Sequence, residues 1–393
     1  MSSLDAATLA GKWNYPTTMH FGVGRIAMLP DACRSLGMSR PLLITDPGLA
    51  KLPLVPQTVA LNEAAGLPTG VFSQVRANPV GADVDAGVAA YKAGGHDGVI
   101  AFGGGSALDA AKAVALMVGQ DRPLWDFEDI GDWWTRVNVA GMAPVVAVPT
   151  TSGTGSEVGR ASVIKDEDAE VKKIIFHPNM LPAIVIADPA LTAGLPPFLT
   201  AATGMDALSH SLEAFCAPGF HPMAEGIAVE GMRLVHLSLL DAFRDGNDLV
   251  ARARMMAASS MGATAFQRGL GAMHAMAHPI GAVLDAHHGT INAVVMPYVL
   301  LFNRSVIEDR LARLSAYMGL PKGGFTGFLD WVLGLREQLG IPHTTEALGV
   351  TEVLIPRLAE MAAVDPSAGT NPLKLTPQNL AVLLEKTRTG DLS

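Results

Sequence analysis

The sequence is poor in the residues that mark several classes of protein. It has only 2 cysteines in 393 residues, Cys33 and Cys216, which lie far apart and in no metal-binding motif. A disulfide framework is therefore not expected, and we expect a reducing, cytoplasmic location. With 28 basic residues against 37 acidic ones, the net charge is −9, and no basic run is long enough to form a patch. This balance argues against nucleic acid as a partner.

Long apolar runs are also lacking. No run approaches the roughly 18–20 residues that span a bilayer, so no membrane partner is expected. The first residues, MSSLDAATLAGKWNYP, lack a basic segment followed by an apolar stretch, and we expect no signal peptide there. Charged residues make up only 17% of the chain and hydrophobic ones 49%. We therefore expect part of the surface to be buried in a homo-oligomer, a dimer or larger.

In the first half, short apolar runs alternate with alanine-rich stretches of helical spacing. The expected helices cover residues 84–93 and 107–118, and the expected strands cover residues 41–45, 70–74, 97–102, 145–149 and 183–187. Strands alternating with helices predict a Rossmann-like α/β domain with a parallel sheet. Residues 17–28 alternate around glycines and predict a hairpin.

After about residue 188 the pattern changes. Long Ala/Leu/Met-rich segments of helical periodicity dominate, and runs of β-branched residues nearly vanish. The sequence therefore predicts two domains, an α/β domain over residues 1–189 and an all-α domain over residues 190–393.

Carboxylate and histidine residues in the second half have the spacing of metal ligands. Asp206 and His210 lie four residues apart, so a helix would present both on one face. About sixty residues later, HAMAHPIGAVLDAHHG contains four of the chain's 11 histidines: His274, His278, His287 and His288. One carboxylate with several imidazoles suits Fe(II) or Zn(II) better than Ca(II) or Mg(II). The alternative is that Asp206 and His210 form a helix-face hydrogen bond and the later histidines are scattered polar positions. Spacing alone does not say which of the later histidines bind.

A second candidate site is the nucleotide loop DGVIAFGGGSALDAAK, residues 97–112. A strand, a glycine turn and a helix start in this order can bind a diphosphate through free backbone N–H groups and the helix dipole. Ser106 adds a hydroxyl donor, and Asp109 and Lys112 are placed to hold the loop or reach the cofactor. The loop differs from the common GxGxxG fingerprint. Asp46, at the end of an earlier strand, can accept the ribose hydroxyls and repel a 2′-phosphate, which favours NAD over NADP. The alternative is a tight turn without a ligand.

A polar loop follows another apolar strand in VVAVPTTSGTGSEVG, residues 145–159. Its hydroxyls, beginning with Thr150 and Thr151, lie where an open α/β sheet binds ligands, at the carboxyl end of a strand.

These blocks together resemble the iron-containing, or group III, alcohol dehydrogenases, which share a dehydroquinate synthase-like fold. The resemblance covers nearly the whole chain, and it rests on blocks that include FGVG, TD, NP, GGGSALDAAK, PTTSGTGSE, LPPFLTAATGMDALSHSLEAF, HAMAHPIGA, HHG and NPLKLTPQNLAVLL. It implies a metal held by four ligands: Asp206, His210, His274 and His288. It also implies that His278 lies beside the metal as a proton-handling catalytic residue and that His287 lies outside the ligand set.

The resemblance also implies a set of NAD-binding residues: Asp46, Asn78, Gly104, Gly105, Ser106, Asp109, Thr150, Thr151 and Lys172. Lys173 is the alternative to Lys172 because it stands next to it. One departure is visible, since His221-Pro222 stands where the family pattern predicts a more polar stretch ending in NP.

The expected function is that of a metal-dependent, NAD-linked alcohol dehydrogenase that acts on a small alcohol or aldehyde by hydride transfer. Fe(II) is the expected metal, with Zn(II) possible. The alternatives on the same scaffold are a lyase of the dehydroquinate synthase type and an enzyme of the glycerol dehydrogenase type. A phosphorylated, carboxylated substrate needs several lysines and arginines, and the segments around the metal residues contain no basic residue except histidine. A nucleotide-binding regulator without catalysis would leave the four metal-type residues unexplained.

Overall fold

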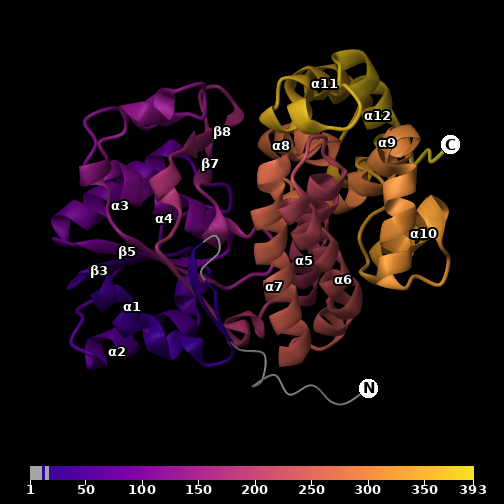
Figure 1. Ribbon diagram of the computed structural model, residues 1–393. Helices are drawn as coiled ribbons and strands as arrows, with labels where there is room; N and C mark the ends of the chain where they lie inside the picture. The colour runs from indigo at the N-terminus through magenta and orange to yellow at the C-terminus, as the bar shows by residue number, and fades with distance from the viewer. Residues whose placement is uncertain (1–10, 14–16) are drawn as a thin grey trace. The chain divides into compact units, whose positions relative to one another are not determined.

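The computed structural model describes residues 11–13 and 17–393, so most of the segment in which no signal peptide is expected lies outside the described residues. The chain divides into two compact units, the first ending at Gly194 and the second running from Leu195 to Ser393 (Figure 1). The boundary predicted between residues 189 and 190 falls shortly before this division.

A seven-stranded sheet forms the centre of the first unit. Its strand order is β4-β3-β5-β6-β9-β2-β1, and every pairing is parallel except that of β1 with β2. Strands β3, β5, β6 and β9 are buried along their whole length, which explains their continuous apolar sequences. The strands are β1 Gly11–Trp13, β2 Thr18–Phe21, β3 Pro41–Ile44, β4 Gly70–Phe72, β5 Gly98–Gly103, β6 Val145–Pro149 and β9 Ile184–Ala187.

Helices cover both faces of this sheet. Figure 1 shows α1 and α2 on one face and α3 and α4 on the other. The helices are α1 Leu29–Ser35, α2 Leu54–Ala64, α3 Gly81–Ala93 and α4 Gly105–Met117. The prediction of a Rossmann-like parallel sheet with helices on both faces is confirmed.

The hairpin predicted over residues 17–28 is wrong. Its first half is β2, which pairs with β9 and β1, while Arg25–Met28 form a 3-10 helix. Gly24 adopts a φ of 79° before this helix, and the carboxylate of Asp188 accepts the Ile26 N–H at 3.0 Å. A contact across 162 residues therefore overrides the local alternation.

A real hairpin lies later in the first unit and was not predicted. Strands β7 (Ala161–Asp166) and β8 (Val171–Phe176) pair antiparallel as a separate two-stranded sheet. Strand β7 buries every second residue, but these are Ser162, Ile164 and Asp166, and β8 is only partly buried, so neither strand shows an apolar alternation.

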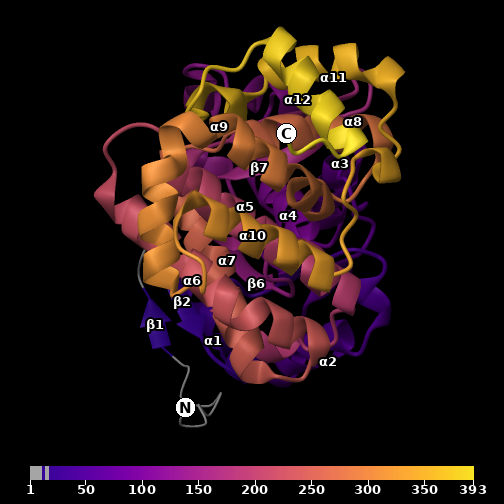
Figure 2. The same cartoon turned by 90° about the vertical axis from the view of Figure 1, so that its right-hand side faces the viewer.

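The second unit contains only helices among its described elements. They are α5 Pro197–Cys216, α6 Pro222–Arg244, α7 Leu249–Ala265, α8 Ala272–Leu284, α9 His288–Met318, α10 Gly324–Gln338, α11 Ile355–Ala363 and α12 Pro377–Thr389. Helix α5 packs against α6, α7 and α9, and α10 lies along α9 (Figure 2). The prediction of an all-α second half is confirmed.

Two sequence features of this unit have simple structural explanations. His221, at the departure from the family pattern, caps α6 because its Nδ1 accepts the Ala224 N–H at 3.3 Å, and Pro222 is the first helical residue. Helix α9 is long and apolar enough to cross a membrane by length and composition, which the search for continuous apolar runs did not predict. Of its most apolar window, 67% is buried inside the structure, as in a core helix.

Candidate functional site

The predicted metal residues converge in the second unit. Asp206 and His210 lie one turn apart on α5, and His274 lies on α8; all three are buried, and their candidate ligand atoms lie within 4.8 Å of one another. Asp206 Oδ1 is 4.0 Å from both His210 Nε2 and His274 Nε2. The imidazoles of His210 and His274 stack with ring centres 4.8 Å apart.

His288 completes this cluster from a third helix. It is the first residue of α9, and its Nε2 lies 3.6 Å from Asp206 Oδ1. A Cβ at the next residue, Gly289, would lie 2.2 Å from the Ala202 carbonyl oxygen, so only glycine lets α9 begin this close to α5. His287 precedes the helix with an exposed side chain. The structure therefore brings His288, and not His287, to Asp206.

The buried carboxylate of Glu213 contacts His274 at Nδ1, whereas Nε2 of the same ring faces Asp206. Glu213 Oε2 lies 2.6 Å from His274 Nδ1, and Glu213 Oε1 accepts the Met273 N–H at 2.7 Å. Burial raises the pKa of Glu213 to about 7 and, together with the nearby His210, holds the pKa of His274 well below its usual range. A neutral imidazole with its Nδ1–H on Glu213 directs the Nε2 lone pair toward Asp206.

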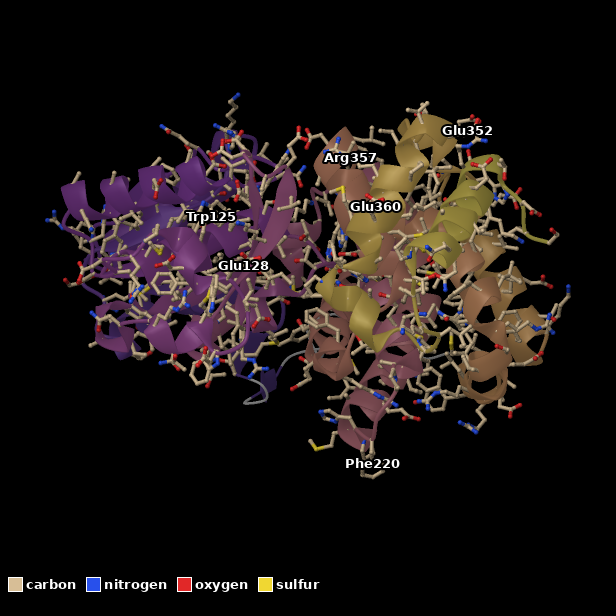
Figure 3. All side chains as sticks on the ribbon, turned by 90° about the horizontal axis from the view of Figure 1, so that it is seen from above. Trp125, Glu128, Phe220, Glu352, Arg357 and Glu360 are labelled. Atoms are coloured by element: carbon tan, nitrogen blue, oxygen red, sulfur yellow. The ribbon has the colours of Figure 1, made fainter. Side chains whose placement is uncertain are left out.

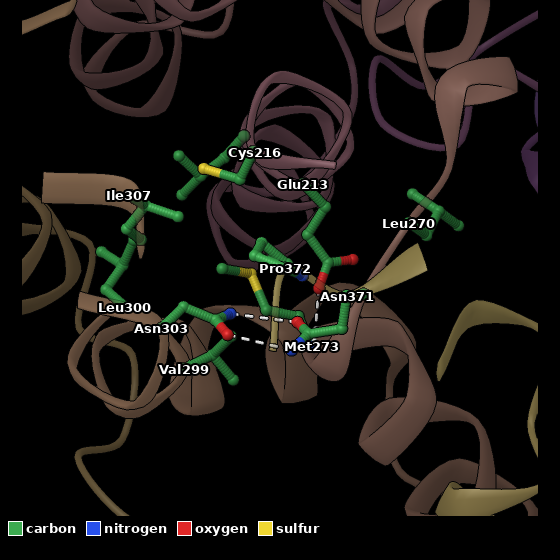
Figure 4. Close-up of a pocket in the computed structure, with 12 residues that line it drawn as sticks. Glu213, Cys216, Leu270, Met273, Val299, Leu300, Asn303, Ile307, Asn371 and Pro372 are labelled. Atoms are coloured by element: carbon green, nitrogen blue, oxygen red, sulfur yellow. Dashed lines mark hydrogen bonds between the residues drawn. The ribbon is translucent and has the colours of Figure 1, made fainter. Parts of the chain in front are cut away.

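The space beside Glu213 is small. A pocket of about 10 Å³ lies there, lined also by Met273, Asn303 and Asn371 (Figure 4). The amides of Asn303 and Asn371 bond to each other at 2.9 and 3.0 Å. This volume accommodates about one water molecule and is too small for a substrate.

His278 lies beside the cluster with a carboxylate partner of its own. Helix α8 runs on through Pro279, so His278 does not cap a turn there. Its ring stacks on His288 with centres 5.4 Å apart, and its Nδ1 is 2.8 Å from Asp365 Oδ2. Burial would raise the pKa of Asp365, but attraction to His278 and hydrogen bonds from Ser367 outweigh burial and hold that pKa below its usual range.

In the first unit, most of the predicted nucleotide residues lie on one edge of the sheet. Strands β3, β4, β5 and β6 are parallel, so the loops that follow them share that edge. The chain leaves the neighbouring strands β3 and β5 in opposite directions, toward β4 and β6, which is the switch point where such sheets bind ligands. The predicted residues in these loops and at the start of α4 are Asp46, Asn78, Gly104, Gly105, Ser106, Thr150 and Thr151.

The glycine turn presents the start of a helix. Gly103 has a φ of 145°, and α4 begins at Gly105, two residues earlier than predicted. No side chain caps the helix, so its first N–H groups can bind an anion. A Cβ at Gly105 would lie 2.5 Å from Thr154 Cγ2, so glycine lets the hydroxyl-rich loop lie against the turn.

Asp109 holds the loops together in the structure. Its carboxylate accepts the Ser156 Oγ–H at 2.5 Å and the Val163 N–H at 2.9 Å, and it pairs with the buried Lys112 at 3.2 Å. Lys112 also donates to the carbonyls of Ser156 and Ala161. Asp109 therefore braces the hydroxyl-rich loop and β7 against α4.

One carboxylate oxygen of Asp46 accepts hydrogen bonds from the turn that follows it. Its Oδ1 accepts the N–H groups of Gly48 and Leu49, both at 2.8 Å. The carboxylate is partly exposed directly beyond β3, beside the switch point.

Lys172 and Lys173 lie on opposite sides of β8. Lys173 pairs with Asp166 at 2.9 Å and Glu128 at 3.7 Å, and its Nζ lies 5.1 Å from the centre of the Trp125 ring. Trp125 and Glu128 are labelled in Figure 3. These contacts commit Lys173 to the packing of β8.

Sequence reasoning missed three residues beside the second-unit cluster: Glu213, Asn292 and Asp365. Glu213 and Asn292 could have been found from helical spacing. Glu213 lies three residues after His210, and Asn292 lies four residues after His288 on the same helix. Asp365 could not, since 87 residues separate it from His278.

Comparison with known proteins covers both units. The family described as iron-containing alcohol dehydrogenase matches residues 16–189, and the C-terminal part of the Fe-containing alcohol dehydrogenase family matches residues 200–388. The chain is 40% identical over 382 residues to 4-hydroxybutyrate dehydrogenase of Cupriavidus necator, covering 95% of this chain and 98% of that protein. It is 34% identical over 380 residues to 1,3-propanediol dehydrogenase of Klebsiella pneumoniae, covering 94% and 97%. The crystal structure of a 1,3-propanediol oxidoreductase superposes with a TM-score of 0.89 at 33% identity, covering 94% and 97%.

Proposed function

This chain belongs to the iron-containing alcohol dehydrogenase family and is an oxidoreductase, and on that premise we propose that it interconverts a short primary alcohol and its aldehyde with NAD(H) and a divalent metal. The observation that carries the proposal is the cluster of one carboxylate and three imidazoles around Asp206 Oδ1.

The chemistry of this cluster fits a borderline divalent cation. Asp206, His210, His274 and His288 would hold the metal, which we propose is Fe(II). Asp206 and His274 are almost fully buried, and the Nδ1–Glu213 contact supports an Nε2 lone pair on His274. Lone pairs gathered in a buried site need a positive partner. When bound, the metal would supply Lewis-acid polarisation of the substrate oxygen.

His278 is the proposed proton-handling residue. Its Nδ1 is held by Asp365, which fixes the ring and leaves Nε2 to exchange a proton with the substrate hydroxyl. The stacking on His288 keeps the ring next to the metal residues.

The sheet edge of the first unit is the proposed NAD site. The start of α4 would bind the diphosphate, and Thr150, Thr151 and Lys172 would contact the rest of the cofactor. The carboxylate of Asp46 would accept ribose hydroxyls and repel a 2′-phosphate, so we propose a preference for NAD over NADP.

The substrate class follows from the relatives and from the flanking sequence. The two enzymes compared above are named for 4-hydroxybutyrate and 1,3-propanediol, which are both short primary alcohols with a second polar group at the far end. The segments AATGMDALSHSLEAF and GLGAMHAMAHPIGA contain no lysine or arginine. This absence favours a small substrate over a phosphorylated one. We further propose a cytoplasmic homo-oligomer.

The test is an aldehyde and alcohol panel on protein purified anaerobically and loaded with Fe(II) or Zn(II). We expect consumption of NADH with succinic semialdehyde or 3-hydroxypropanal, and formation of NADH with the matching alcohols. Metal content measured in the same samples assigns the active ion. Stoichiometric metal and NAD binding without net NADH turnover on any member of the panel would point to the lyase alternative and contradict the proposal.

A further inference from the structure

Asn292 occupies the centre of the metal cluster, and the family pattern quoted above gives it no role. It lies one turn after His288 on α9 and is fully buried. Its Nδ2 lies 3.0 Å from Asp206 Oδ1, 3.3 Å from His274 Nε2 and 3.2 Å from His288 Nε2. We infer that Asn292 is a positioning residue that holds the carboxylate of Asp206 in place for the metal. The inference rests on the proposed function, because it takes these atoms as the metal ligands.

The chemistry of the neighbours fixes the orientation of the amide. A carboxylate oxygen accepts hydrogen bonds, and the NH₂ group of asparagine only donates them. The opposite orientation would place the carbonyl oxygen of Asn292 against the same carboxylate oxygen and two ring nitrogens. The Asn292 carbonyl oxygen itself has no hydrogen-bond partner among the described residues. The NH₂ group of Asn292 therefore makes the hydrogen bonds that hold this side chain.

Two hydrogens serve three acceptors in this arrangement. The shortest of the three contacts is the one to Asp206, so the carboxylate takes one hydrogen and the two imidazoles compete for the other. An imidazole that accepts at Nε2 carries its proton at Nδ1, which for His274 agrees with the contact to Glu213. The Nε2 atom of each imidazole has one lone pair, so a bound metal would displace its contact with Asn292, whereas Asp206 Oδ1 has a second lone pair and can accept from Asn292 while it binds the metal.

This arrangement gives Asn292 a definite effect on metal binding. In the absence of an ion, the lone pairs of Asp206, His274 and His288 repel one another, and the NH₂ group of Asn292 lies 3.0–3.3 Å from all three. Loss of the amide should let the Asp206 carboxylate turn away from the two imidazoles before metal arrives. Residues that orient metal ligands typically contribute 10- to 100-fold to metal affinity.

The test compares two buried asparagines on the same helix. Asn292→Leu removes the central amide, and Asn303→Leu removes a buried amide that bonds to Asn371 instead. Co(II) is the probe, because its visible absorption reports the ligand geometry directly, and its Kd is measured by chelator competition on the full-length apoprotein. We expect Asn292→Leu to raise the Kd for Co(II) about 10- to 100-fold and to change the spectrum. Asn303→Leu should lower the Tm while leaving the Kd and spectrum unchanged.

A second variant covers the case in which Asn292→Leu does not fold. Asn292→Asp keeps the shape and replaces the donors with a carboxylate, so the apoprotein should have a lower Tm and Co(II) should raise that Tm more than in the wild type. An unchanged Kd and spectrum in Asn292→Leu, or an unchanged response to Co(II) in Asn292→Asp, would overturn the role of Asn292 alone. Wild-type protein that binds no Co(II) would overturn the proposed function as well.

Discussion

The two candidate sites of this molecule are built from different parts of the chain. The cluster in the second unit consists of side chains on α5, α8 and α9, of which only His288 is partly exposed, with Asp206 at its centre. The glycine turn in the first unit, where the diphosphate is proposed to bind, consists of backbone at the end of β5 and the start of α4. A side-chain site depends on residue identity, whereas a backbone site depends on the loops that shape it. Single substitutions should therefore have larger effects in the second unit than in the first.

The largest effect is expected from adjacent histidines at the start of α9. His288→Ala should lose stoichiometric metal and reduce kcat/KM about 10³-fold, because it removes a ligand from the group that polarises the substrate. His287→Ala is the matched control and should retain both metal and activity, since His287 is exposed. Elemental analysis after dialysis and steady-state rates decide the point. Loss of metal in His287→Ala with retention in His288→Ala would reverse the ligand assignment.

His278 should separate catalysis from metal binding within the same unit. His278→Ala should keep stoichiometric metal and lose about 10²-fold in turnover, which is the usual scale for removing a proton-transfer group. The paired measurement is metal content and the rate with an active aldehyde. If metal is lost, His278 is a ligand; if turnover stays at the wild-type level, it is structural.

A smaller effect is expected at the sheet edge of the first unit. Asp46→Gly should shift the ratio of NADPH to NADH activity toward NADPH by about 10- to 100-fold, because a negative charge facing the 2′-phosphate is removed. Asp46→Asn is the sharper variant, since its side-chain oxygen can still accept the N–H groups of Gly48 and Leu49. Wild-type enzyme that uses NADPH as readily as NADH would contradict the role of Asp46.

The sequence predicted the helices and strands better than it predicted the contacts between residues far apart in the chain. Strand β6 matches its predicted residues, and the helical spacing of Asp206 and His210 is confirmed, because both features depend on local patterns. The hairpin over residues 17–28 failed because Asp188 holds Ile26 from far along the chain. The role of Asp365 could not be predicted from the sequence for the same physical reason, since its contact with His278 exists only in the folded unit. The choice of His288 over His287 came from the resemblance and not from spacing.

The smallest expected effect is a change in the rate of cysteine labelling. It tests whether each unit is stabilised separately by its own ligand, with one cysteine in each unit as the probe. Cys33 lies on α1 in the first unit, and Cys216 ends α5, the helix that carries Asp206 and His210. Cys33 is buried and Cys216 is partly buried. Burial raises the pKa of both thiols to about 12, so almost no thiolate exists at pH 8 and local opening should speed labelling. A ligand that binds only the folded unit slows such opening, by about tenfold when its concentration is tenfold above Kd. We therefore expect metal to slow the labelling of Cys216 but not of Cys33, and NAD to slow the labelling of Cys33 but not of Cys216. Mass spectrometry of the labelled peptides over time measures both rates in one sample. If either ligand slowed the labelling of both cysteines equally, the two units would open together. The contrast between a side-chain site and a backbone site would then not extend to the stability of the two units.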